Sequence, residues 1–408
     1  MYFLYDLAVR FSWLMLQIAA FFNPKIRHFV RGRKESIPYL QSRRNPEKPL
    51  IWMHTASLGE FEQGMPVFEK LHAAFPDHQF LVTFFSPSGY EVKKHRLHSD
   101  LVTYLPMDTR PRTREFIRTI RPEIALFVKY EVWPRLFKEL HRQDIPILML
   151  SAIFRPRQAY FKWYGGFLRK ALIRVAHFYV QDDRSAELLA SIGLEHVTVS
   201  GDTRFDRVLE ILESPRELEF MDRFRGQRTC LAAGSTWPED HELLIPFINQ
   251  LEEGACFVIA PHKIDPKTLE NLQNRLEKET VLYSNVDSMG IQAADVLIID
   301  TIGLLTKIYG YADIAYVGGG FATGLHNTLE PAVYGIPVLC GPQYHKFREA
   351  EELVDAGGIV VVKDPGEFQS RVTALIKSPE ARKEIGQINT AYIRENDGAS
   401  DKIMSGIL

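Results

Sequence analysis

Short apolar runs rich in β-branched and aromatic residues alternate with longer amphipathic stretches over most of this 408-residue chain. Strands separated by helical patterns are typical of parallel βαβ units, because a parallel connection needs a crossover that a helix supplies. The pattern therefore predicts an α/β protein with two Rossmann-like domains in tandem. The predicted strands are 50–56, 80–85, 101–106, 124–129, 146–153, 177–181 and 196–201, then 230–235, 256–261, 281–284, 295–300, 314–320, 337–342 and 359–362.

The two groups of strands set the expected domain boundaries. We expect an N-terminal Rossmann-like domain over 49–206 and a C-terminal one over 228–390, joined by a charged, strand-free linker at 207–227. A helix within 391–408 is expected to pack back on the N-terminal domain. Ligands of such sheets bind beyond the carboxyl ends of the strands, so a cleft between the domains is the expected site.

The first 22 residues depart from this alternation because they are almost all apolar, and their length matches the ~20 residues that span a bilayer. Asp6, Arg10 and Gln17 interrupt the run and fall within about 40° of one another on a helix. A narrow polar stripe favours a helix that lies in one leaflet over one that spans the membrane. The alternative is an apolar helix buried in a domain core.

Residues 25–48 carry eight Lys and Arg side chains against Glu35 and Glu47. A basic cluster next to an apolar helix attracts anionic head groups and marks the cytoplasmic side. Residues 1–48 are therefore predicted to associate with the membrane. A signal peptide is disfavoured, because neither a charged n-region nor an A-x-A cleavage site is present.

Composition argues against two other classes of function. The 49 basic and 51 acidic side chains give a net charge of −2, so no global positive field exists to hold nucleic acid. Cys230, Cys256 and Cys340 lie far apart in apolar runs, without CxxC or zinc spacing, and are typical of buried thiols in a reducing compartment. We expect no metal site.

Glu60 is the main candidate for acid–base chemistry. Ser57 and Glu60 follow the strand at 50–56 with the S-x-x-E spacing of a capping box, and on spacing alone capping is the favoured interpretation. The catalytic alternative is that Glu60, at the mouth of the cleft, takes a proton from a hydroxyl nucleophile. Gly59 would allow a close approach to the backbone.

The glycine-rich end of the predicted strand at 314–320 is the most informative motif. Three glycines let a backbone fold closely around a ligand, and a helix start capped by Asn327 or Thr328 presents N–H donors to an anion. His326 is suited to a phosphate and Glu330 to a ribose diol. Two weaker signals end other strands: Ser235, before a predicted Thr236–Glu239 capping box, and the basic pair at 262–263.

Eight short motifs in this order resemble the 3-deoxy-D-manno-octulosonic acid (Kdo) transferases of lipopolysaccharide inner-core synthesis, over essentially the whole chain. They are W-M-H-T-A-S-L-G-E (52–60), S-P-S-G (86–89), L-P-M-D (105–108), R-P-E-I-A-L-F-V-K-Y-E-V-W-P-R (121–135), G-D-T-R-F-D (201–206), A-A-G-S-T (232–236), A-P-H-K (260–263) and the block G-G-G-F…H-N-T-L-E-P-A (318–332).

The resemblance implies a GT-B fold and a metal-independent, inverting transfer of Kdo from CMP-Kdo to a lipid A precursor, at the cytoplasmic face of the bacterial inner membrane. It implies Glu60 as the catalytic base, no cofactor, and no nucleic-acid partner. The acceptor residues implied are Ser57, Gly59, Ser88, Lys129 and Glu131. The donor residues implied are Arg204, Ser235, His262, Lys263, Gly318, Gly319, Gly320, Phe321, His326, Asn327, Thr328 and Glu330.

The chain departs from the family pattern at several positions, among them Gly320, where a Ser is common, and Leu325, where a Gly is common. The family reads P-R-H where this chain has Pro261-His262-Lys263, so the arginine role would pass to Lys263 or Arg204. Lys129 replaces the first carboxylate of an E-x-E-x-W-P motif. Two other functions stay open on the same scaffold: another nucleotide-sugar enzyme such as a UDP-sugar epimerase, and a non-catalytic nucleotide-sugar or lipid-binding protein.

Overall fold

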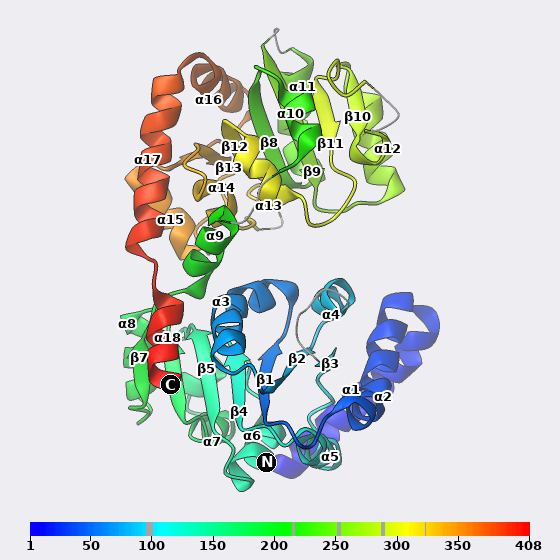
Figure 1. Ribbon diagram of the computed structural model, residues 1–408, viewed down its shortest axis with the longest axis vertical. Helices are drawn as coiled ribbons and strands as arrows, with labels where there is room; N and C mark the ends of the chain where they lie inside the picture. The colour runs from blue at the N-terminus through cyan, green and yellow to red at the C-terminus, as the bar shows by residue number, and fades with distance from the viewer. Residues whose placement is uncertain (95–100, 214–216, 251–253, 287–289, 323) are drawn as a thin grey trace. The chain divides into compact units, whose positions relative to one another are not determined.

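The computed structural model describes residues 1–94, 101–213, 217–250, 254–286, 290–322 and 324–408 (Figure 1). The chain divides into two compact units. Unit 1 comprises Met1–Arg207 and Asp397–Leu408, and unit 2 comprises Val208–Asn396. The two units are described separately below.

Unit 1 is built on a seven-stranded parallel sheet of order β3-β2-β1-β4-β5-β6-β7. Helices on both sides bury the central strands, which explains why these strands are continuous apolar runs without polar alternation. All seven predicted strands of this region are confirmed. Their bounds are β1 Leu50–Thr55, β2 Gln79–Phe84, β3 Leu101–Tyr104, β4 Ile124–Val128, β5 Ile147–Ala152, β6 His177–Val180 and β7 Val197–Val199.

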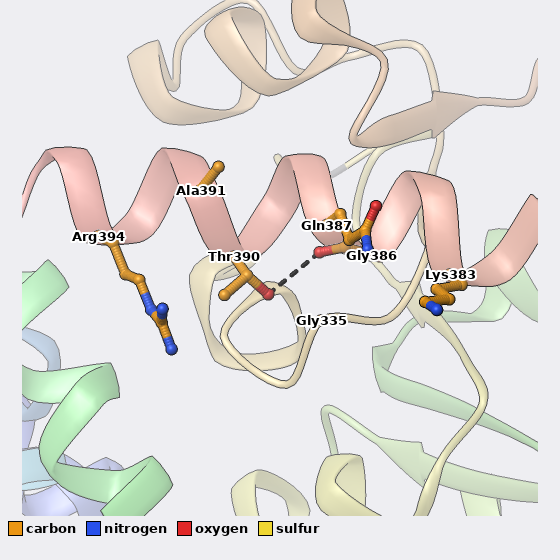
Figure 2. Close-up of a pocket in the computed structure, with 7 residues that line it drawn as sticks. All are labelled: Gly335, Lys383, Gly386, Gln387, Thr390, Ala391 and Arg394. Carbon is orange, nitrogen blue, oxygen red and sulfur yellow. Dashed lines mark hydrogen bonds between the residues drawn. The ribbon is translucent and has the colours of Figure 1, made fainter.

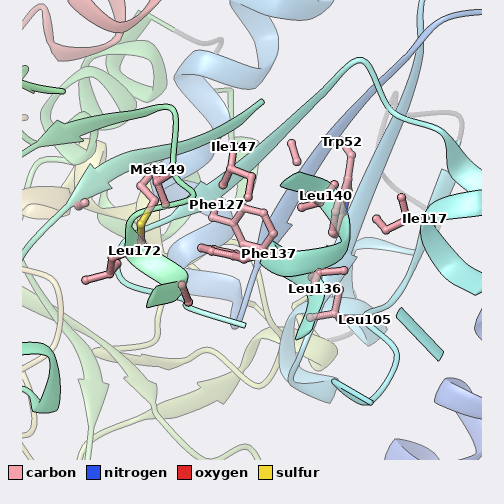
Figure 3. Packing of buried hydrophobic residues seen from close by; sticks show 14 of the residues in the cluster. Trp52, Leu105, Ile117, Phe127, Leu136, Phe137, Leu140, Ile147, Met149 and Leu172 are labelled. Carbon is pink, nitrogen blue, oxygen red and sulfur yellow. The ribbon is translucent and has the colours of Figure 1, made fainter. Parts of the chain in front are cut away.

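One face of this sheet carries an aromatic core (Figure 3). The Trp52 ring meets Phe116 and Phe127 edge to face, with centroids 5.2 and 5.3 Å apart. Its indole N–H donates to Thr83 Oγ1 at 2.9 Å, so its buried polar atom is satisfied.

The main helices of the unit are α3 Leu58–Ala74, α4 Pro87–Lys93, α5 Arg110–Ile120, α6 Pro134–Arg142, α7 Gly166–Leu172 and α8 Asp183–Ala190.

Two helices precede the sheet, α1 (Tyr2–Phe22) and α2 (Pro24–Arg43), and they lie side by side (Figure 1). Of the α1 residues only Ala20 is buried, so the alternative of a core helix is wrong. By length and composition α1 is apolar enough to cross a membrane. Its exposed apolar side chains are Phe3, Leu4, Leu7, Phe11, Leu14, Met15, Ile18, Phe21 and Phe22.

The amino-terminal turn of α1 is fastened to the body of unit 1. Arg135 Nε donates to Asp6 Oδ1 at 2.7 Å, and this ion pair is largely shielded from water. Tyr5 donates its hydroxyl to Asp108 Oδ2 at 2.7 Å. Asp6, which belongs to the predicted polar stripe, therefore holds the helix against the protein.

Unit 2 repeats the architecture with a second seven-stranded parallel sheet, of order β10-β11-β9-β8-β12-β13-β14. All seven predicted strands of this region are also confirmed. Their bounds are β8 Thr229–Thr236, β9 Ala255–Pro261, β10 Thr280–Leu282, β11 Val296–Ile298, β12 Ile314–Val317, β13 Val338–Cys340 and β14 Ile359–Val361. The helices are α10 Glu219–Arg225, α11 Pro238–Asn249, α12 Pro266–Arg275, α13 Leu305–Ile308, α14 Leu329–Ala332, α15 Arg348–Ala356, α16 Pro365–Lys377 and α17 Pro379–Glu395.

The chain passes between the units twice. Helix α9 (Thr203–Glu213) contains the first boundary, and α18 (Ala399–Ile407) follows the second. Helix α18 packs on α3, where Ile403 and Met404 join the core of unit 1. Ser400 N donates to Asp206 Oδ1 at 2.8 Å. Part of the segment predicted as a linker is folded, because α10 buries Met221 and Phe224 in unit 2.

The Asp6–Arg135 pair gives a test of how α1 is held. Asp6→Ala leaves Arg135 unpaired in a shielded position, so amide hydrogen exchange in the first turns of α1 should accelerate about tenfold or more. The matched control is Glu35→Ala, which breaks the exposed Arg31–Glu35 pair on α2 and should change exchange there less than about fivefold. Equal effects of the two variants in their own helices would contradict this attachment of α1.

Candidate functional site

The residues predicted to bind the acceptor gather where the strand order of unit 1 reverses. Strand β1 lies between β2 and β4. The connection after β1 runs toward β2 and the connection after β4 runs toward β5, so a crevice opens between the carboxyl ends of β1 and β4. Ser57, Gly59 and Glu60 follow β1, and Lys129 and Glu131 follow β4. The fold thus brings five predicted residues from two separate motifs to one edge of the sheet.

Glu60 caps its own helix with one oxygen. Ser57 is the N-cap of α3 and its hydroxyl accepts from Glu60 N at 3.5 Å, which confirms the predicted cap. Glu60 Oε2 accepts from Ala56 N at 2.6 Å. The Ser57 N–H also donates to this carboxyl. Capping and proton transfer are nevertheless compatible, because the two oxygens of a carboxylate offer about four lone-pair positions and the backbone donors occupy only part of them.

The surroundings of Glu60 raise the pKa of its carboxyl. Glu60 is only 8% exposed, and burial is the largest cause of the rise. The negative charge of Glu131 raises it further, whereas the Ala56 N–H and the Lys129 ammonium act in the opposite direction. A carboxylate with a raised pKa holds a proton more strongly and is a better general base.

Two side chains beside this edge, one buried and one half-buried, were not among the predicted site residues. His54 is 0% exposed, and its Nδ1 lies 2.9 Å from Thr83 Oγ1. Its Nε2 lies 3.8 Å from Glu131 Oε2 and has no hydrogen-bond partner in the described residues. Trp133 Nε1 is likewise buried without a described partner. The sequence signal that could have identified His54 is its position as a histidine among the apolar residues of β1.

The remaining predicted acceptor residues differ in what surrounds them. Gly59 is exposed, and a Cβ placed there would meet nothing within 4 Å, which leaves room for a ligand. Lys129 has a left-handed backbone with φ 63°, and its N–H donates to Leu150 O at 2.9 Å. Ser88 lies in α4 after β2, and its side chain falls outside the described part.

Unit 2 has the same arrangement at the carboxyl end of β8, which lies between β9 and β12. Ser235, in the left-handed region with φ 53°, is the last residue but one of β8, and the glycine-rich turn follows β12. A Cβ on Gly318 would lie 2.5 Å from Ser235 O, so only glycine allows the two strand ends to approach this closely. A Cβ on Gly320 would similarly lie 2.6 Å from Gly341 N.

Asp240 holds these turns together. Its buried carboxylate accepts from Trp237 N at 2.8 Å, from Gly319 N at 2.9 Å and from the Tyr316 hydroxyl at 2.6 Å. The predicted Thr236–Glu239 capping box is wrong. Helix α11 begins at Pro238, so Trp237 is its N-cap, and the side chain of Asp240 accepts from the N-cap backbone. Thr236 Oγ1 instead lies 2.9 Å from His241 Nε2.

Trp237 connects two predicted histidines and was itself missed. Its ring stacks on His262 with centroids 4.5 Å apart, and its Nε1 donates to His326 Nε2 at 3.0 Å. Lys263 Nζ lies 5.0 Å from the centroid of the same ring. The residues after β8, β9 and β12 thus form one aromatic and basic cluster, which comprises Trp237, His262, Lys263 and His326.

The two histidines of this cluster are neutral near pH 7. Burial and the neighbouring His262 lower the pKa of His326 to about 4. Burial and the Lys263 ammonium also lower the pKa of His262. Lys263 is therefore the cation of the cluster, and the imidazoles contribute hydrogen bonds rather than charge.

Glu330 is oriented by its own loop. Its Oε1 accepts from Asn327 Nδ2 at 3.1 Å, and its Oε2 accepts from Thr306 Oγ1 at 3.3 Å. Asn327 Oδ1 accepts from Leu329 N at 3.2 Å, and Thr328 is the buried N-cap of α14 without a side-chain cap bond. Helix α14 has only four residues, so its dipole is much weaker than the motif suggested.

Two further observations define the limits of this cluster. Arg204 belongs to unit 1, where its Nε donates to Asp202 Oδ2 at 2.8 Å, whereas the other predicted donor residues belong to unit 2. Phe321 packs against the core of unit 2. A cavity of about 380 Å³ along α17 contains none of the predicted residues (Figure 2); it is lined by Gly335, Lys383, Gly386, Gln387, Thr390, Ala391 and Arg394.

Solved structures with the same fold include nucleotide-sugar enzymes. The UDP-GlcNAc 2-epimerase from Neisseria meningitidis bound to UDP-GlcNAc aligns with a TM-score of 0.61 at 16% identity, over 88% of this chain and 99% of that one. The putative UDP-N-acetylglucosamine 2-epimerase from Listeria monocytogenes also has a TM-score of 0.61, at 13% identity, over 88% of this chain and 96% of that one. These likenesses confirm the predicted fold of two Rossmann-like domains.

Sequence relatives are more specific. A family model described as 3-deoxy-D-manno-octulosonic-acid transferase (kdotransferase) matches residues 31–207. The 3-deoxy-D-manno-octulosonic acid transferase of Haemophilus influenzae is 26% identical over 87% of this chain and 85% of its own length. That of Chlamydophila psittaci is 26% identical over 98% of this chain and 94% of its own length. The predicted resemblance of this chain to the Kdo transferase family is therefore confirmed over most of its length.

Proposed function

We propose that this protein is an inverting, metal-independent glycosyltransferase that moves Kdo from CMP-Kdo to a lipid A precursor in lipopolysaccharide synthesis. Its Kdo transferase relatives support the substrate class. The observation that carries the mechanism is the Glu60 carboxylate, which is buried, has a raised pKa, and lies beside the charges of Lys129 and Glu131.

Glu60 acts as the general base in this proposal. Its carboxylate takes the proton from an acceptor hydroxyl as the hydroxyl oxygen bonds to the anomeric carbon of Kdo. The bond from this carbon to the phosphate oxygen breaks at the same time, and CMP leaves with the electron pair. A single displacement with one base inverts the anomeric centre. Lys129 and Glu131, beside Glu60, are proposed to orient the acceptor together with Ser57, Gly59 and Ser88.

Unit 2 is proposed to bind the nucleotide. The phosphate of CMP is already a stable anion, so its departure requires charge neutralisation rather than a strong acid. Lys263 supplies this charge, and the neutral His262 and His326 supply hydrogen bonds. The oriented carboxylate of Glu330 can accept hydrogen bonds from the ribose diol. The glycines at 318–320 allow the ligand to approach the backbone.

The N-terminal helices are proposed to place the enzyme at the cytoplasmic face of the inner membrane. The exposed apolar side chains of α1 suit the acyl region of one leaflet, and the basic residues of 25–48 suit anionic head groups. A lipid acceptor would then be reached without leaving the bilayer.

The direct test incubates purified protein in detergent with CMP-Kdo and a tetra-acylated lipid A precursor, and detects products by mass spectrometry. A product heavier by one or more Kdo residues, formed equally well with a metal chelator present, is the expected result. Absence of product from folded protein, together with conversion of a UDP-sugar, would instead indicate an epimerase. CMP-Kdo binding without turnover would indicate a non-catalytic binding protein.

The pKa of Glu60 predicts the acid limb of the pH profile. Because the Glu131 charge raises the pKa of Glu60, Glu131→Gln should move the acid limb of kcat/KM to lower pH, whatever it does to the maximal rate. Glu123→Gln is the control, since Glu123 precedes β4 at the other end of the strand and is exposed. An unchanged acid limb in Glu131→Gln would show that the charge of Glu131 does not influence the pKa of Glu60.

The hydrogen bond from Trp237 should influence the pKa of His326. Because Trp237 Nε1 donates to His326 Nε2, that nitrogen must lose this bond before it can accept a proton. Trp237→Phe keeps an aromatic ring but removes the donor, so the pKa of His326 should rise from about 4. NMR titration of the histidine Cε1 protons measures the change, with the exposed His345 as reference. An unchanged or lower pKa of His326 would contradict the role of this bond.

A further inference from the structure

Unit 1 contains a cavity of about 290 Å³ that none of the proposed catalytic or substrate-binding residues lines. It lies between α1, α2 and the segment that connects β3 to α5. Four of its lining side chains are basic, and none is acidic. The basic residues are Arg10, Arg33, Lys34 and Arg112.

Arg33 is the least expected of these residues, because it is a cation that is only 5% exposed. Its terminal nitrogens donate to backbone carbonyls, Nη1 to Phe29 O at 3.4 Å and Nη2 to Phe85 O at 2.5 Å. Its Nε is buried and has no hydrogen-bond partner in the described residues. Burial lowers the pKa of Arg33 to about 9. A buried cation without a carboxylate is costly, and an anion in the cavity would remove that cost.

The other basic residues leave the cavity positive. Arg10 and Lys34 form no ion pair with any residue that the structure describes. Arg112 makes an exposed 3.4 Å contact with Glu115, which does not line the cavity. Three or four cations around one small space match a group that carries two negative charges, such as a terminal phosphate monoester.

The apolar surroundings indicate that this phosphate belongs to a lipid. Trp13 and Met107 also line the cavity. Arg10 is flanked on α1 by the exposed side chains of Leu7, Phe11 and Leu14. Acyl chains packed along these residues would bring their head group to Arg10, whereas a soluble phosphate would leave them in water.

The attachment of α1 fixes the orientation of this helix. Asp6 and Tyr5 tie its first turns to Arg135 and Asp108, and α2 packs along it. These contacts hold the first turns of α1, and the side of α1 that faces α2, against unit 1. The exposed apolar side chains of α1 would therefore enter a single leaflet.

We propose that the cavity between α1, α2 and the β3–α5 segment binds the terminal phosphate of a membrane lipid head group while α1 lies in one leaflet. This site is separate from Glu60 and from the aromatic and basic cluster of unit 2. Its occupation does not depend on the transfer reaction, so it can be tested without activity.

The test is co-sedimentation of the full-length protein with phosphatidylcholine vesicles that contain either phosphatidic acid or phosphatidylglycerol, at equal surface charge. The wild type should prefer phosphatidic acid by about tenfold, because only that lipid presents a terminal phosphate monoester. Arg10→Gln, Lys34→Gln and Arg33→Gln should each abolish most of this preference. Arg10 and Lys34 are exposed, so their variants remain informative if Arg33→Gln fails to fold, which thermal melting will reveal.

Arg31→Gln is the matched control, because Arg31 lies on the same helix and is exposed but does not line the cavity. It should lose at most about fivefold in binding to both lipids and keep the preference. The proposal fails if Arg31→Gln removes the preference as fully as Arg10→Gln, which would indicate diffuse attraction. It also fails if inorganic phosphate at matched ionic strength releases the protein from phosphatidic acid vesicles, which would indicate a site for free phosphate.

Discussion

The reversal of strand order in a parallel sheet is the constraint on which the candidate site of each unit depends. In unit 1 it places the ends of β1 and β4 next to each other, and in unit 2 it does the same for β8 and β12. Residues some 70 or 90 positions apart, such as Glu60 and Glu131 or Trp237 and His326, become neighbours for this reason. The same architecture thus supplies one carboxylate-containing edge and one basic edge, each with its own chemistry.

At each edge, a structural interaction also prepares a chemical group. The Ala56 N–H fixes one oxygen of Glu60, and the burial that accompanies this cap raises the pKa of the carboxyl. In unit 2 the hydrogen bond from Trp237 holds His326 with Nε2 unprotonated. Stability and function therefore rest on the same contacts, and substitutions at these positions need readouts that separate the two.

The fold was predictable from sequence because helices cover both faces of the central strands, so these strands are largely apolar runs. The gathering of the predicted residues at the carboxyl ends of the strands was predictable because polar residues follow those runs directly. What could not be predicted were contacts between distant segments. In the sequence nothing distinguishes Trp237 from other aromatic residues, because His326 reaches its indole only through β12. Likewise Arg33 is one of eight basic residues at 25–48, and only the fold shows that it is buried. Which carboxylate accepts from the N-cap backbone of α11, Asp240 or Glu239, depended on the residue at which the helix begins.

The central claim is that the Glu60 carboxylate receives the proton of the acceptor. Glu60→Gln tests it most directly, since the amide oxygen can still accept from Ala56 N while the side chain can no longer act as a base. We predict that this variant binds CMP with wild-type affinity and loses transfer by at least about a hundredfold. Transfer by Glu60→Gln at a rate close to that of the wild type would contradict the account and leave Glu60 as a helix cap alone.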